Sequence, residues 1–143
     1  MKSITITQPW ATLIVLGAKH YETRTWETRH RGGLAIHAAR RFPEDQRELC
    51  RQEPFRSILR QAGYFSWFDL PTGAVLGTVQ LTDCLPVEDV PPLDPTEWAL
   101  GDYHPGRWAW VLAAARELPA PVPYRGMRGM YEIPADCLEG FLP

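Results

Sequence analysis

Two segments in the second half of the chain constrain the fold most, residues 74–82 and 108–116. In both of them every second residue belongs to one of two interleaved sets of side chains, which is the period of a β-strand. The first segment carries Gly77 on its apolar side, and a glycine inside a strand indicates a bulge or bend of the kind that barrels need. The second segment is almost wholly apolar, so we expect it to be a central strand.

Shorter segments in the first half predict further strands and one helix. Residues 3–7, 19–26 and 34–38 have strand-like patterns of β-branched, aromatic or apolar residues. After the first of them, Pro9 suits the start of a helix of about two turns, and Gly17 is a natural end for it. The chain should therefore begin with a strand, a helix and two more strands.

The remaining segments predict few regular elements. Residues 43–63 have a helical pattern that Pro54 interrupts, and residues 85–106 predict a long loop with one helical turn at 96–100. A short strand-like piece follows at 122–124. We therefore predict an α+β fold, a small mixed β-barrel of five to six strands with a helix after the first strand and one or two further helices.

Length and composition fit a single domain that spans residues 1–143. The chain has 143 residues, 45% of them hydrophobic, and shows no internal repeat or linker. No segment approaches the roughly 20 consecutive apolar residues of a membrane span, and the N-terminus has no apolar signal-peptide core. We expect a cytoplasmic protein that does not bind membranes.

The cysteines and histidines do not predict a metal site. Cys50, Cys84 and Cys137 lie too far apart in sequence for a close-spaced ligand pair, and the pattern is not that of a disulfide framework. The four histidines are scattered singly, without the spacing of a zinc site. We expect reduced thiols and no built-in metal or cofactor.

Charge is distributed unevenly along the chain. Residues 1–60 hold 11 basic and 6 acidic residues, a balance of +5, whereas residues 61–143 hold 4 and 11, a balance of −7. The basic segment is a candidate site for phosphates, although such a segment can also be a solvated surface. The pI near 6.1 argues against strong nonspecific binding to duplex DNA.

Lys19 is the first candidate for a functional residue. Of the 15 basic residues, 13 are arginine, so a lysine at this position stands out. Lysine is a compact point charge that can lose its proton when it is desolvated, whereas arginine practically cannot. The alternative is an ordinary exposed lysine in a turn.

Three spaced motifs resemble those of the ASCH domain family. They are Gln8-Pro-Trp-Ala11, then Gly17-Ala-Lys-His-Tyr-Glu-Thr-Arg24, which fits GxKxxExR, and Arg31-Gly-Gly-Leu-Ala-Ile-His-Ala-Ala39. Residues 73–83 and 107–112 look like the two long strands of the family, so the resemblance covers about residues 3 to 131. It implies a PUA-like β-barrel with the first helix packed across it, in a small stand-alone protein of the bacterial type.

The resemblance implies RNA binding in a cleft between the barrel and the first helix. Lys19 and Arg24 can donate to a phosphate or a base edge, and tryptophans can stack on a base. Glu22 can orient Arg24 or accept from a base, or it can form only a structural ion pair with Arg24. We expect at most two of the six tryptophans to touch a ligand. The predicted binding residues are Trp10, Lys19, Tyr21, Glu22, Arg24, Trp26, Arg31 and His37.

The first functional hypothesis is a module that binds single-stranded RNA or a modified nucleotide. The second is an amidohydrolase that acts on N4-acetylcytidine, since some small bacterial members of the family use the motif lysine, a threonine and an acidic residue. Here Lys19 matches the lysine, Glu22 replaces the threonine, and Glu97 is the best acidic candidate. A neighbouring carboxylate favours the charged form of a lysine, which argues against its acting as a base.

Two other hypotheses follow from the family. A ribonuclease can draw acid and base groups from Lys19, Tyr21, Glu22 and His37, with a divalent ion recruited by the substrate phosphate. His37, however, lies in an apolar strand, where a core histidine is expected. The last hypothesis is a coactivator-like adaptor that binds a protein; the sequence shows no partner domain, disordered arm or acidic tail, so we predict no obligate protein partner.

Overall fold

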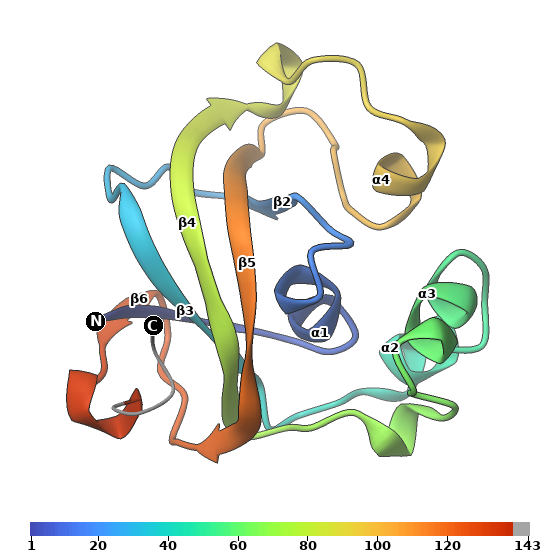
Figure 1. Cartoon of the computed structure of the whole chain (residues 1–143). Helices are drawn as coiled ribbons and strands as arrows, with labels where there is room; N and C mark the ends of the chain where they lie inside the picture. The colour runs from blue at the N-terminus through green and yellow to red at the C-terminus, as the bar shows by residue number, and fades with distance from the viewer. Residues whose placement is uncertain (139–143) are drawn as a thin grey trace.

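The computed structural model describes residues 1–138 and contains one mixed six-stranded sheet that curls into a half-barrel (Figure 1). The strand order is β2-β5-β4-β3-β1-β6, with β1 and β3 parallel and the other neighbours antiparallel. This confirms the predicted mixed β-barrel architecture. The strands are β1 (Lys2–Ile6), β2 (Tyr21–Arg24), β3 (Gly32–Ala38), β4 (Ala74–Pro86), β5 (Trp108–Pro123) and β6 (Met130–Glu132).

Irregular pairing between β3, β4 and β5 gives the sheet its curvature. The β4–β5 register shifts between Val75 and Gly77 and at two later points, and such bulges increase local twist. A Cβ atom on Gly77 would lie 2.2 Å from the carbonyl oxygen of Arg116, so only glycine lets the two strands approach this closely. The bulge that the sequence predicts at Gly77 is confirmed.

The first helix, α1 (Trp10–Val15), packs across the half-barrel, and Gln8 holds its start. The Gln8 side chain accepts a hydrogen bond from the backbone N–H of Thr12 at 3.0 Å and donates to the Thr12 hydroxyl at 2.7 Å. It also donates to the carbonyl of Pro71 at 2.8 Å. Gly17, with a φ of 77°, follows the last turn as predicted. The QPWA motif is therefore a helix-start motif with a buried glutamine.

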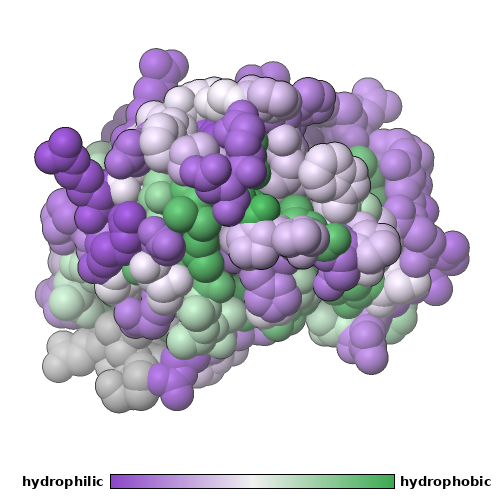
Figure 2. Space-filling view, turned by 90° about the horizontal axis from the view of Figure 1, so that it is seen from above, coloured by the Kyte–Doolittle hydropathy of each residue, from purple (hydrophilic) through white to green (hydrophobic). Residues whose placement is uncertain are grey.

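Two short helices, α2 (Glu44–Leu49) and α3 (Phe55–Gln61), lie to one side of the half-barrel (Figure 1). They confirm the helical pattern interrupted by Pro54. A cluster of buried apolar side chains joins them to α1; its members are Leu13, Phe42, Phe55, Leu59, Leu70 and Leu100. Viewed from above, apolar side chains lie in the middle of the face and hydrophilic ones border them (Figure 2).

The second half of the chain differs from the sequence prediction in its strand lengths. β5 is a single strand that continues from the segment predicted at 108–116 into the piece predicted separately at 122–124, and it ends at Pro123. Another strand, β6, follows the glycine-spaced residues 125–129 and pairs with β1. Between β4 and β5 lie η2 (Val87–Asp89) and α4 (Pro95–Ala99), the latter at the predicted helical turn. The remaining elements are η1 (Trp67–Asp69) and η3 (Ala135–Leu138).

The described residues contain no helix that is both long and apolar enough to cross a membrane. Cys50, Cys84 and Cys137 are unbonded to one another; Cys84 is buried and the other two are half-buried.

Candidate functional site

A cavity of about 370 Å³ opens beside α1, where the end of β1 faces β2 and the segment that leads into β5. This is the place between barrel and first helix at which the family resemblance implies a cleft. Segments distant in sequence meet here because β2 pairs with β5 at one edge of the sheet. The lining comprises residues 5–7, Trp10, Lys19, residues 22–24, Gly101, Asp102 and Arg107.

Lys19 is buried in the wall of this cavity, with only 3% of its surface exposed. Its ammonium group donates to the backbone carbonyl of Tyr21 and lies 5.9 Å from the centre of the Tyr103 ring. Burial lowers the pKa of Lys19, and the carboxylates of Glu22 and Glu97 only partly offset that effect. Lys19 is therefore a buried, desolvated side chain, not an exposed lysine in a turn.

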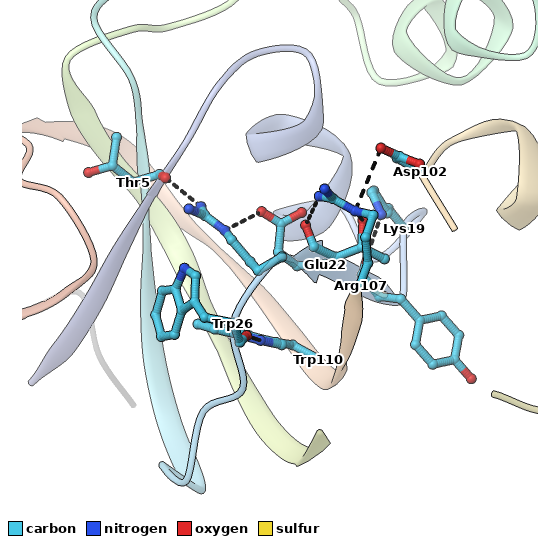
Figure 3. A network of polar contacts seen from close by, with 10 residues as sticks. Thr5, Lys19, Glu22, Trp26, Asp102, Arg107 and Trp110 are labelled. Atoms are coloured by element: carbon cyan, nitrogen blue, oxygen red, sulfur yellow. Dashed lines mark hydrogen bonds and ion pairs between the residues drawn. The ribbon is translucent and has the colours of Figure 1, made fainter. Parts of the chain in front are cut away.

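Glu22 and Arg24 form an ion pair on one face of β2, at 3.2 Å between Oε2 and Nε (Figure 3). Arg24 also donates from Nη2 to the carbonyl of Thr5 at 2.7 Å, which connects β2 to the end of β1. The structural ion pair considered from the sequence is thus present, and both side chains line the cavity.

Arg107 is a cavity residue for which the sequence predicts no functional role. It donates from Nη2 to the carbonyl of Thr23 at 2.7 Å, and its Nε lies 3.6 Å from a carboxylate oxygen of Asp102 (Figure 3). One feature of the sequence does single out Arg107, because it is one of only four basic residues within the acidic stretch 61–143. No feature of the sequence indicates a role for Asp102, because it lies in a long loop and belongs to no spaced motif.

The cavity carries a small positive charge and one aromatic wall. With every side chain counted in its ordinary charged form, three basic residues, Lys19, Arg24 and Arg107, face two carboxylates, Glu22 and Asp102, so three minus two leaves +1. Trp10 is half-buried, and its indole N–H is bonded to the carbonyl of Leu100 at 2.9 Å, which fixes the ring. Cationic donors beside a fixed aromatic ring suit a phosphate next to a base.

Glu97 and Tyr21 lie outside the cavity lining, next to Lys19. Glu97 is buried, and one of its oxygens accepts from the backbone N–H of His20 at 2.7 Å and contacts His20 Nδ1 at 2.8 Å. Its other oxygen accepts from the Tyr103 hydroxyl at 3.4 Å, and burial together with the nearby Glu97 carboxylate raises the pKa of Tyr103. The Tyr21 ring packs edge-on against Tyr103. Glu97 thus ties α4 and the following loop to the segment that carries Lys19.

Three of the predicted binding residues, Trp26, Arg31 and His37, do not line the cavity. Trp26 is 36% exposed and packs edge-on against Trp110. Arg31 donates to the carbonyls of Thr28 and His30 at 3.0 and 2.9 Å.

His37 is buried, as expected for a core histidine. Its Nε2 donates to the carbonyl of Tyr124 at 2.6 Å, which leaves Nδ1 to accept from the Thr5 hydroxyl at 3.1 Å. Burial lowers its pKa, so the neutral imidazole is favoured. Across residues 1–138, no group of three or more histidine, cysteine, aspartate or glutamate side chains is placed to hold a metal ion.

Comparison with protein families identifies the domain that contains the cavity. The ASCH domain model matches residues 4–121, a range that includes every residue of the cavity lining. The chain belongs to the ASCH domain family. The ASCH domain here is 42% identical over 82 residues to human activating signal cointegrator 1 and 44% identical over 78 residues to the mouse protein. Those segments make up 57% and 54% of this chain but only 14% and 13% of the two relatives.

Solved ASCH structures from Zymomonas mobilis share the fold. One superimposes with a TM-score of 0.57 at 14% identity and covers 96% of this chain and 90% of the other. A single-residue mutant of that protein gives a TM-score of 0.55 at 13% identity, covering 97% and 94%.

Proposed function

We propose that this ASCH domain binds single-stranded RNA, with one nucleotide in the cavity beside α1. The observation that carries the proposal is the convergence of Lys19, Arg24 and Arg107 on a cavity with Trp10 in its wall. Ligand sites are typically about 300 to 1,000 Å³, so a cavity of about 370 Å³ suits one nucleotide. Sequence-specific RNA recognition takes place on unpaired bases that can be splayed out and stacked, which favours a single strand over a duplex.

The two arginines are anchored so that part of each guanidinium remains available. Arg24 uses Nε and Nη2 for Glu22 and Thr5, and Arg107 uses the same two nitrogens for Thr23. In the part of the chain that the structure describes, Nη1 of neither arginine has a hydrogen-bond partner. These Nη1 groups supply donors for phosphate oxygens, while the Glu22 and Asp102 carboxylates supply acceptors for a base amino or a ribose hydroxyl group.

Binding of a fluorescently labelled RNA octanucleotide of randomised sequence, followed by anisotropy, tests the proposal. Arg24→Gln and Lys19→Met should each weaken binding by roughly 10- to 100-fold, the usual effect of losing a hydrogen bond to a charged group. Arg29→Gln is the matched control, because Arg29 is exposed and outside the cavity lining. Wild-type affinity in both cavity variants, with circular dichroism confirming that they fold, would refute the proposal.

A second candidate function is deacylation of N4-acetylcytidine, and one observation favours it. Burial lowers the pKa of Lys19 even though Glu22 and Glu97 act in the opposite direction, so a neutral amine is more accessible than for an ordinary lysine. Mass spectrometry of RNA that contains one N4-acetylcytidine, incubated with wild type and Lys19→Ala, separates intact RNA from a deacylated base and from a cut backbone. Deacylation by wild type alone supports this function, and unchanged RNA from both rejects it.

A further inference from the structure

A wide groove lined by four arginines lies directly next to the cavity. We infer that the RNA strand runs from the cavity over Thr5 into this groove, which holds the phosphates of the neighbouring nucleotides. We call it the arginine groove and define it by Arg40, Arg41, Arg125 and Arg128. The inference rests on the proposed function and makes it more specific, since it states where the nucleotides next to the one in the cavity bind.

The charge of the groove is strongly one-sided. Its volume is about 1,150 Å³, and its lining contains four arginines but no aspartate or glutamate. All four arginines are exposed, and none forms an ion pair with any residue between 1 and 138. Guanidinium groups match phosphate oxygens in two-point contacts, so this lining is complementary to a polyanion.

The fold brings the four groove arginines together, and their positions in the sequence do not predict this. Residues 61–143 hold 4 basic and 11 acidic residues, yet Arg125 and Arg128 lie in this groove and Arg107 lies in the cavity. The other two groove arginines follow β3, so the groove joins the end of β3 to the segment between β5 and β6. Of the four basic residues in the acidic half, three therefore line one of the two hollows.

Thr5 connects the cavity to the groove, because it lines both. Its backbone carbonyl accepts from Arg24 in the cavity, at 2.7 Å. Its hydroxyl lies 3.1 Å from His37 Nδ1 and 2.7 Å from the Tyr131 hydroxyl, and His37 lines the groove. One residue of β1 thus separates the two sites, so a strand leaving the cavity can enter the groove directly.

The wall that carries Arg125 and Arg128 is held in place against β1 and β3. His37 donates to the carbonyl of Tyr124 at 2.6 Å, which fixes the residue before Arg125. A Cβ atom on Gly126 would lie 2.8 Å from His37 Cε1 and 2.9 Å from the Thr5 hydroxyl, so only glycine permits this approach. The glycine-spaced segment that carries Arg125 and Arg128 thereby acquires a role: it presents two arginines on a fixed backbone.

Binding measured at several salt concentrations tests the inference. The probes are the four ribonucleoside 5′-monophosphates, a labelled RNA octanucleotide of randomised sequence, and a labelled octaglutamate. The variants are Arg125→Ala/Arg128→Ala and Arg40→Ala/Arg41→Ala. The control, Arg29→Ala/Arg116→Ala, removes two exposed arginines that line neither site.

We expect wild type to bind the octanucleotide more tightly than any monophosphate. Each groove variant should make the slope of log affinity against log salt shallower by about 1.4, since each phosphate contact on a single strand contributes about 0.7. Monophosphate affinity should stay at the wild-type value, and the control should keep the wild-type slope.

Other outcomes overturn the inference and can be told apart. If monophosphates bind but the octanucleotide binds no more tightly, or if the groove variants keep the wild-type slope, the groove inference fails and the proposed function stands. If octaglutamate binds as tightly as the octanucleotide, the groove is a site for acidic protein segments and the inference fails. Absence of binding by every RNA probe overturns both.

Discussion

Arg107 donates two hydrogen bonds to Thr23, from Nη2 to the backbone carbonyl at 2.7 Å and from Nε to the hydroxyl at 3.4 Å. Thr23 lies on β2, and Arg107 immediately precedes β5, the strand with which β2 pairs. The Arg107 guanidinium therefore holds two parts of the cavity lining together, β2 and the segment that leads into β5. It also contributes one of the positive charges of the cavity.

Replacing Arg107 separates these two roles. Arg107→Ala should lower the free energy of unfolding by about 1 to 3 kcal/mol, because the carbonyl of Thr23 loses a charged donor. Arg107→Lys keeps the charge but loses the two-point geometry, so it should retain more stability than alanine while still weakening RNA binding. Urea denaturation and anisotropy measure the two effects, and equal stability of all three proteins would contradict this account.

The stability of the protein should depend on pH through Lys19. In the unfolded chain the lysine titrates near 10.5, whereas burial lowers its pKa in the folded protein. Between these two values the unfolded chain binds more protons, so stability rises with pH in that range. Below the folded pKa the buried ammonium is destabilising in full, and that cost disappears as the pH rises toward 10.5.

Lys19→Met removes this dependence, since methionine does not titrate. The free energy of unfolding of wild type minus that of Lys19→Met should therefore increase as the pH is raised from 7 to 10.5. Urea denaturation of both proteins at each pH gives this difference. A difference that stays constant across the range would show that Lys19 titrates normally.

Glu97 should act as a positioning residue, because hydrogen bonds to His20 and Tyr103 occupy both of its oxygens. Glu97→Gln keeps an acceptor for the His20 N–H and should preserve most of the RNA affinity. Glu97→Ala removes every contact and should lower the free energy of unfolding by about 1 to 3 kcal/mol. Full loss of RNA binding in the glutamine variant, with stability unchanged, would instead assign Glu97 a direct role.

Two glycines on paired strands offer a matched test of the half-barrel. Gly77→Ala places a Cβ atom 2.2 Å from a backbone oxygen, so the strands must separate, and we expect a loss of more than about 2 kcal/mol or failure to fold. Gly33→Ala meets only the flexible ends of Met1 and Gln80, at 3.2 and 3.8 Å, and should be tolerated. Thermal unfolding compares the two, and similar melting temperatures would argue against the close approach at Gly77.

Local patterns in the sequence predict most of the elements but not their full extent. The sequence predicts the interruption between α2 and α3 at Pro54 and the bulge at Gly77, because each depends on a single proline or glycine. The continuation of β5 through Pro119 and Pro121 is not visible, since prolines normally exclude a central strand. Here β2 pairs only with the first part of β5, and the register with β4 shifts between Glu117 and Val122, so neither proline has to supply a ladder N–H.

The candidate site is only partly visible in the sequence for a related reason. Lys19, Glu22 and Arg24 lie within one short motif, so their proximity follows from local spacing. Asp102 and Arg107 join them only because β5 pairs with β2, which is a contact between distant segments. The arginine groove likewise depends on how the ends of β3 and β5 meet, and no local pattern encodes that.

The most direct test of the central claim is a backbone amide NMR titration of the ¹⁵N-labelled protein with the four ribonucleoside 5′-monophosphates. We predict saturable shift changes for the amides of residues 5–7, 22–24 and 101–107, which surround the cavity beside α1. Saturable changes confined instead to residues around Arg51, Arg56 and Arg60, which line a separate hollow, would contradict the assignment of the cavity, as would the absence of any saturable change.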